Sequence, residues 1–156
     1  MSLIANAYRR RPRGFTLVEL LIVITVILIL AGLAIPNMLE SRMAANESSA
    51  IGSMRVISKA METYQLRNVG GNYAYPSHIQ DLGALVPPEL DPILASGQKS
   101  GYAFAGGGDA SNYAITACPI QFGTTGRRSF FIDASGAIRS VVNNGAPATA
   151  TDPVLQ

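Results

Sequence analysis

The distribution of hydrophobic residues divides the chain into stretches with different periods. Between Phe15 and Ile35, 17 of 21 residues are hydrophobic, and Glu19 is the only charged one. As a helix, a run of about 20 apolar residues matches the roughly 30 Å hydrocarbon core of a bilayer. The first stretch is therefore predicted to be a membrane-spanning helix.

Beyond this run the apolar positions keep a helical spacing. The residues that recur at alternating intervals of four and three are Ala50, Met54, Ile57, Met61 and Tyr64. Such a stripe indicates one face of an amphipathic helix. Proline commonly stops a helix in water, yet the pattern continues past Pro36. We therefore predict one helix from about Phe15 to Asn68, with a kink at Gly32 and Pro36.

The second half of the chain has the period of two that is typical of strands. The candidate strands are 101–105, 113–118, 129–133 and 137–142, and the glycine run 106–108 is assigned to a hairpin turn between the first two. The predicted fold is α+β. A long kinked N-terminal helix, with its first half transmembrane, packs its second half on a small antiparallel sheet of about four strands. Residues 143–156 are predicted to be a flexible tail.

Composition narrows the range of functions. The 156 residues favour one domain, and a formal charge of +2 gives no reason to expect a nucleic-acid binder. The chain has one cysteine, Cys118, and one histidine, His78, which exclude an intrachain disulfide and a histidine-rich metal centre. No pattern of a nucleophile with its base, and no phosphate-binding loop, emerges. We expect no enzyme, no cofactor and no metal site.

Three interpretations of residues 1–36 compete. Four arginines, at positions 9, 10, 11 and 13, precede the apolar run and no basic cluster follows it, which predicts a cytoplasmic N-terminus. The segment could be a plain membrane anchor, or a secretory signal cut at the small residues Gly32 to Ala34. Neither of these two interpretations explains why Glu19 is present. A carboxylate near the centre of a spanning helix raises the free energy of membrane insertion by a few kcal/mol. The secretory interpretation also leaves the helical periodicity across the cut unexplained.

The third interpretation rests on the sequence RGFTLVEL at residues 13–20. It resembles the cleavage motif of type IV prepilins and type II secretion pseudopilins. The resemblance implies that a membrane peptidase cuts between Gly14 and Phe15 on the cytoplasmic side and then N-methylates Phe15. It divides the chain into a leader, 1–14, a transmembrane and assembly helix, 15–36, a pilin-like globular domain with the second half of the helix, 37–142, and the tail.

The resemblance also implies a role for Glu19. In this family the glutamate pairs with the terminal amine of a neighbouring subunit during assembly. Because an unpaired charge is costly in apolar surroundings, such a pair would set the axial register between apolar helices. The side chains implied in the helix contacts of the filament include Leu17, Val18, Leu20 and Leu21, followed by Ile22 and Val23.

The expected function is a structural subunit of a type IV pilus-like filament, and the alternative is a type II secretion pseudopilin that drives protein export. A third hypothesis is an exported or membrane-anchored monomeric binding domain. The implied partners are a prepilin peptidase and methyltransferase, identical or related pilin subunits, an inner-membrane assembly platform, and lipid before assembly. The chain would cross the bacterial inner membrane once and then enter a periplasmic or cell-surface filament. A calcium site like that of major pseudopilins would need clustered acids, and Asp109, Asp133 and Asp152 are too scattered to propose one.

Overall fold

The computed structural model describes residues 14–68 and 71–155, so the leader predicted at 1–14 lies outside it except for Gly14. The chain forms two compact units that divide between Asn37 and Met38. One helix, α1 (Leu17–Leu66), contributes to both.

Helix α1 has 50 residues and ends close to the predicted position. Asn68 adopts a left-handed backbone with φ of 50°. Its N–H donates to the carbonyl of Gln65 (3.0 Å), and its side-chain oxygen accepts from the N–H of Tyr73 (2.8 Å). The predicted stop at this point is confirmed. At the end of the helix the left-handed residue is Asn68, the second choice after glycine for such a cap, and Gly71 is also left-handed with φ of 83°.

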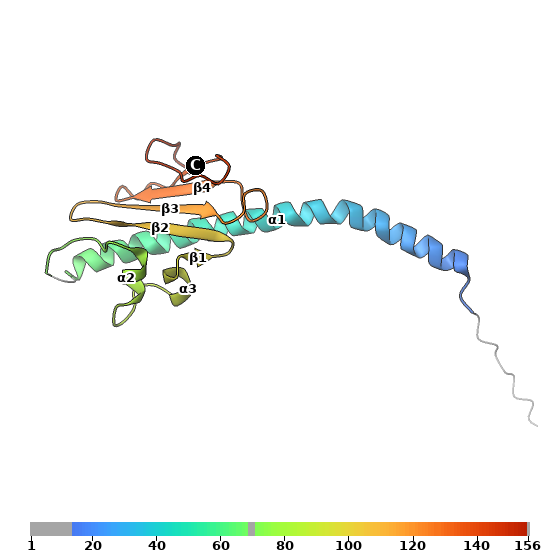
Figure 1. Ribbon diagram of the computed structural model, residues 1–156, viewed down its shortest axis with the longest axis horizontal. Coiled ribbons are helices and arrows are strands. Elements are labelled where there is room, and N and C mark those ends of the chain that lie inside the picture. Colours follow the sequence, from blue (N-terminus) through green and yellow to red (C-terminus); the bar gives the residue numbers. More distant parts are fainter. Residues whose placement is uncertain (1–13, 69–70, 156) are drawn as a thin grey trace, which may run out of the picture. The chain divides into compact units, whose positions relative to one another are not determined.

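The sheet is a simple antiparallel meander in which each strand pairs with the next along the chain (Figure 1). Its strands are β1 (Gln98–Lys99), β2 (Tyr102–Gly108), β3 (Tyr113–Pro119), β4 (Ser129–Asp133) and β5 (Arg139–Val141). Two short helices, α2 (Ile79–Gly83) and α3 (Pro92–Ala95), lie in the connection between α1 and the sheet. The predicted α+β class is confirmed, with five strands instead of about four. The extra strand has two residues, too few to show a period.

The core lies between the second half of α1 and one face of the sheet. The helix contributes Ala50, Met54, Ile57 and Met61, all at most 1% exposed. The facing side chains that are buried with them include Phe104, Ile115, Phe130 and Ile132. Tyr64, the last residue of the predicted stripe, is partly buried against this cluster. The apolar stripe read from the sequence is therefore the core face of the helix.

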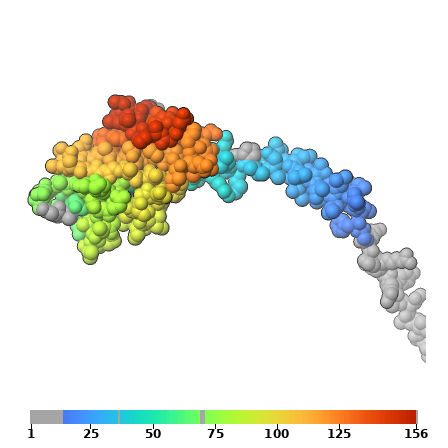
Figure 2. Space-filling model, in the orientation of Figure 1, coloured from blue at the N-terminus to red at the C-terminus, as the bar shows by residue number. Residues whose placement is uncertain are grey.

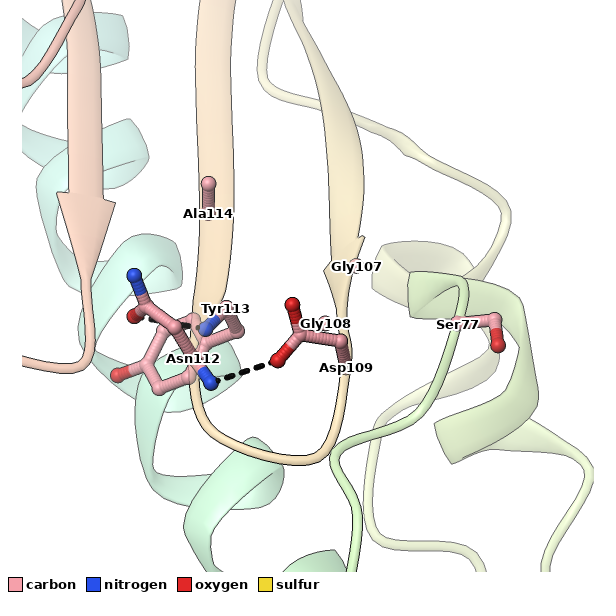
Figure 3. A pocket seen from close by; sticks show the side chains of 7 residues that line it. All are labelled: Ser77, Gly107, Gly108, Asp109, Asn112, Tyr113 and Ala114. Carbon is pink, nitrogen blue, oxygen red and sulfur yellow. Dashed lines mark hydrogen bonds between the residues drawn. The ribbon is translucent and has the colours of Figure 1, made fainter.

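The glycine run 106–108 is in strand β2, and its assignment to a turn was wrong. A Cβ on Gly107 would lie 1.8 Å from the carbonyl oxygen of Ser77, and one on Gly108 would lie 2.4 Å from Cβ of Tyr75. The segment before α2 thus packs flush against the strand, where the N–H of Gly108 donates to the carbonyl of Pro76 (2.8 Å). The glycines are needed for close approach, and the turn follows them at 109–112 (Figure 3).

A buried carboxylate joins α1 to the loop between β3 and β4. Glu47 is 8% exposed. Its Oε1 accepts the N–H groups of Arg127 (2.9 Å) and Arg128 (3.2 Å), and its Oε2 accepts from Nε of Arg128 (2.7 Å). Burial raises the pKa of Glu47, but these hydrogen bonds and the charge of Arg128 outweigh it and hold the pKa below its usual value. No local pattern in the sequence indicates this contact between Glu47 and the loop.

The C-terminal residues that the structure describes lie along β5, in contrast to the predicted flexible tail. The N–H of Ser140 donates to the carbonyl of Pro153 (3.0 Å), and the N–H of Leu155 donates to the carbonyl of Ile138 (2.8 Å). Ala148 is 2% exposed, and Leu155 packs against the core. Figure 2 shows this segment, in dark red, on the outside of the globular unit. The residues that pair with β5 are too few for the alternation of apolar and polar side chains to indicate a strand in the sequence.

We predict that Glu47→Ala lowers the free energy of unfolding of the globular unit by about 2–4 kcal/mol, because it leaves two backbone N–H groups and Arg128 without their acceptor. The measurement is denaturant unfolding of the full chain in detergent, followed by circular dichroism. Glu40→Ala is the matched control, because exposed Glu40 lies 3.9 Å from Nη2 of Arg127. Its expected effect is below about 1 kcal/mol. Equal effects of the two substitutions would contradict the role assigned to Glu47.

Candidate functional site

The stretch that carries the predicted site is the first part of α1. Its apolar side chains are exposed: Leu17 is 80% exposed, and even the least exposed of the large ones, Ile24, is 46% exposed (Figure 2). The most apolar 18-residue window has a mean hydropathy of 3.0 and no buried residue. By length and composition this helix can cross a membrane. An apolar surface of this extent is typical of contact with lipid or with another protein.

The side chains predicted to make helix contacts lie all around this helix. Leu17, Val18, Leu20 and Leu21 cover a little under half of the circumference and are more than half exposed, and Ile22 and Val23 extend the apolar surface to the other side. A helix that is apolar on every side is suited to complete enclosure, either by lipid or by a bundle of other helices. The hydroxyl of Thr25 donates to the carbonyl of Leu21, so it needs no outside partner.

Glu19 makes its contacts at the start of the helix. Its Oε2 accepts hydrogen bonds from the N–H and the hydroxyl of Thr16, both at 2.8 Å, and the hydroxyl of Thr16 accepts the N–H of Glu19 at 3.2 Å. This reciprocal pattern is a capping box, which satisfies helix-terminal N–H groups. The sequence analysis missed the role of Thr16, although the Thr-x-x-Glu spacing is a known signal for it.

The other predicted site residues in the described part of the chain lie just before α1 or within it. Gly14 and Phe15 precede the helix. Phe15 is 86% exposed, so the peptide bond of the predicted cleavage site is not covered by other described residues. The backbone of α1 is helical through Gly32 and Pro36, and the kink there stays a prediction. The four leader arginines lie outside the described residues. Cleavage, methylation and inter-subunit pairing also stay predictions.

His78 and Cys118 have ordinary structural surroundings. His78 precedes α2 at its N-cap position, and its N–H donates to Oδ2 of Asp81 (2.9 Å). Cys118 is a free thiol in β3. It is half-buried, and burial raises its pKa. A thiol in this state is a weak nucleophile.

Three aspartates of the globular unit, Asp109, Asp133 and Asp152, accept hydrogen bonds within their own loops. In Figure 3, Asp109 lies beside Asn112 at the tip of the hairpin, next to a hollow of about 270 Å³ that Ser77 also lines. Oδ1 of Asp109 accepts the N–H groups of Ser111 (2.7 Å) and Asn112 (2.9 Å), which lowers the pKa of this carboxyl. Within residues 14–68 and 71–155, no group of three or more His, Cys, Asp or Glu side chains could hold a metal ion.

The chain was compared with known proteins. Residues 9–35 match a family described as the prokaryotic N-terminal methylation motif. The chain is 36% identical over 93 residues to type II secretion system core protein G of Escherichia coli K12, covering 59% of this chain and 61% of that protein. It is 37% identical over 95 residues to core protein G of Pseudomonas aeruginosa, covering 60% and 64%.

The similarity therefore spans about three fifths of the length of these relatives. No solved structure matches the chain. The matched motif contains Gly14, Phe15 and Glu19, and the fold has the long apolar helix and small antiparallel sheet that the resemblance implies. The methylation motif and these relatives support the family of type IV pilins and type II secretion pseudopilins for this chain.

Proposed function

We propose that this chain is a pseudopilin of a type II secretion system, a structural subunit that polymerises into a short periplasmic filament and performs no catalytic step itself. The observation that carries the proposal is its similarity to proteins named type II secretion system core protein G. These relatives support the pseudopilin alternative more than the type IV pilus that was the first expectation from the sequence.

The exposed apolar helix supports a route from membrane to filament. In the bilayer, residues 15–35 are covered by lipid, with the arginine-rich leader on the cytoplasmic side. In the filament, the same side chains are covered by the helices of other copies. Because lipid tails and packed helices are about equally apolar, this exchange supplies little net driving force. Extraction therefore requires an assembly platform in the inner membrane that supplies energy.

Processing precedes this step. A prepilin peptidase removes residues 1–14 and methylates the new amine on Phe15. Exposed Gly14 and Phe15, just ahead of the helix, support access of the enzyme to an extended backbone. The capping box of Thr16 and Glu19 keeps the first helical turn formed on the other side of the cut.

Glu19 then has two tasks. One carboxylate oxygen, Oε2, caps the helix through Thr16, while Oε1 accepts no hydrogen bond among the described residues. We propose that Oε1 receives the Phe15 amine of a neighbouring copy. Two opposite charges that meet in an apolar bundle favour a single axial stagger of the helices, since any other stagger leaves both charges unpaired.

Deletion of the gene is the test of the function. We expect exported proteins to accumulate in the periplasm, because the filament that moves them is missing, while long surface filaments seen by electron microscopy persist. The measurement compares secreted and periplasmic fractions, with complementation by the intact gene as the control. Normal secretion together with loss of surface pili would instead assign the chain to a type IV pilus.

The mature N-terminus tests the processing. Mass spectrometry of the chain purified from membranes is expected to find N-methyl-Phe15 as the first residue. A first residue at Ile35 would indicate a secretory signal, and an intact Met1 would indicate a plain anchor. Either result would contradict the proposal.

Substitutions at the capping box separate the two tasks of Glu19. Glu19→Gln keeps the hydrogen-bonding acceptor of the cap but removes the charge, so we expect normal cleavage and a filament yield lower by at least about tenfold. Thr16→Ala weakens the cap by about 1 kcal/mol and keeps the charge, so filament yield should change little. Filaments are counted by electron microscopy after overexpression. If Thr16→Ala reduces the yield as much as Glu19→Gln, the helix cap and not the charge is what assembly needs.

A further inference from the structure

The outer edge of β5 is occupied by the C-terminal end of the chain. We call residues 148–155 the strap. Its residue Val154 lies opposite Arg139 in an antiparallel bridge. Two backbone hydrogen bonds flank this pair, from Ser140 to Pro153 (3.0 Å) and from Leu155 to Ile138 (2.8 Å). The strap therefore satisfies the N–H and C=O groups that an edge strand would otherwise present to another chain.

Side-chain contacts fix the strap in place. Ala148 is 2% exposed, and Leu155 packs against the core. Nη1 of Arg139 donates to the carbonyl of Asp152 (2.9 Å). The carboxylate of Asp152 accepts the N–H of Thr149 (2.6 Å), which closes the turn before the strap reaches β5. Packing and hydrogen bonds both hold it against the edge.

The opposite edge of the sheet is also covered by irregular segments of the chain. Strand β1 has two residues, and one of them is Lys99, a residue type that disfavours pairing at an edge. Further along β2, the N–H of Phe104 donates to the carbonyl of Gly97 (2.7 Å) and that of Gly108 to the carbonyl of Pro76 (2.8 Å). Among the described residues, these backbone groups of β2 thus find their partners within the same chain.

We propose that the strap is an edge guard, which prevents β5 of one copy from pairing with β5 of another. Pairing of two β5 edges about a twofold axis would use the donor at Ser140 and the acceptor at Ile138, the same groups that the strap now occupies. It would place Arg139 opposite Arg139 of the second copy, where like charges oppose pairing. The strap is the main barrier, and the arginine adds to it.

The guard has a consequence for assembly, which rests on the proposed function. Subunits that wait in a membrane at high local concentration would aggregate through an open sheet edge. With the edge of β5 covered and the strand at the other edge only two residues long, the exposed apolar helix is left as the polymerising surface. The guard itself is tested without filaments or secretion machinery, so its failure and that of the proposed function are distinguishable.

The test uses a disulfide reporter in the full chain in detergent. Arg139→Cys is introduced with Cys118→Ser, so that the only thiol lies where two β5 strands would face each other as a non-hydrogen-bonded pair. Such a pair, with Cα atoms about 4.5 Å apart, has the geometry of a disulfide. Covalent dimers on a non-reducing gel therefore report pairing of the β5 edges.

Two proline substitutions are then compared in this background. Leu155→Pro removes the N–H that bonds Ile138 and the side chain that packs on the core, and we expect at least about tenfold more covalent dimer than with the reporter alone. Val154→Pro is the matched control, because the N–H of Val154 makes no backbone hydrogen bond in the described part of the chain. It should leave the dimer at the level of the reporter alone.

A synthetic peptide of residues 148–156 separates edge pairing from misfolding. Added in excess to the Leu155→Pro reporter, it should occupy the open edge and return the dimer to the level of the reporter alone. The proposal is overturned if Leu155→Pro does not raise the dimer, if Val154→Pro raises it equally, or if the peptide leaves the dimer unchanged.

Discussion

The feature on which the rest of this protein depends is the apolar surface of residues 15–35, which water cannot cover favourably. Every large apolar side chain in this stretch is exposed, and together these side chains surround the helix. Lipid and a bundle of identical helices are the two environments that enclose such a cylinder. The proposed route of the subunit from membrane to filament is an exchange between these two environments.

The same helix meets a different requirement after Asn37. There it has one apolar face, which the sheet covers, and an opposite face with exposed residues such as Arg55 and Lys59. Burial of Met54, Ile57 and Met61 holds the helix to the sheet, and Glu47 fixes the loop between β3 and β4 on it. One continuous helix thus combines two segments. The apolar surface of the first requires an external partner, whereas the apolar face of the second is covered by the sheet of the same chain.

Polar groups fix relative positions of elements that apolar packing alone does not specify. Apolar helices slide along one another at little cost, whereas the carboxylate of Glu19 can be satisfied at few positions. In the globular unit, Glu47 holds the loop between β3 and β4 in one position. The strap likewise occupies the edge of β5. In each case a small number of hydrogen bonds restricts a contact that hydrophobic burial alone would permit in many forms.

The sequence by itself determined the elements that depend on periodicity and local motif. Side-chain spacing, which is a local property, predicts the apolar run, the core stripe from Ala50 to Met61, the end of α1 near Asn68 and the strands 113–118 and 129–133. The motif at residues 13–20 is equally local.

Tertiary structure decided the rest. The glycines 106–108 became a strand because Ser77 packs on them, and Glu47 became an anchor because the loop at Arg127 and Arg128 folds back to it. Residues 148–155 became a strap because β5 offers an edge. Each of these depends on a partner 13 or more positions away, which no local pattern contains.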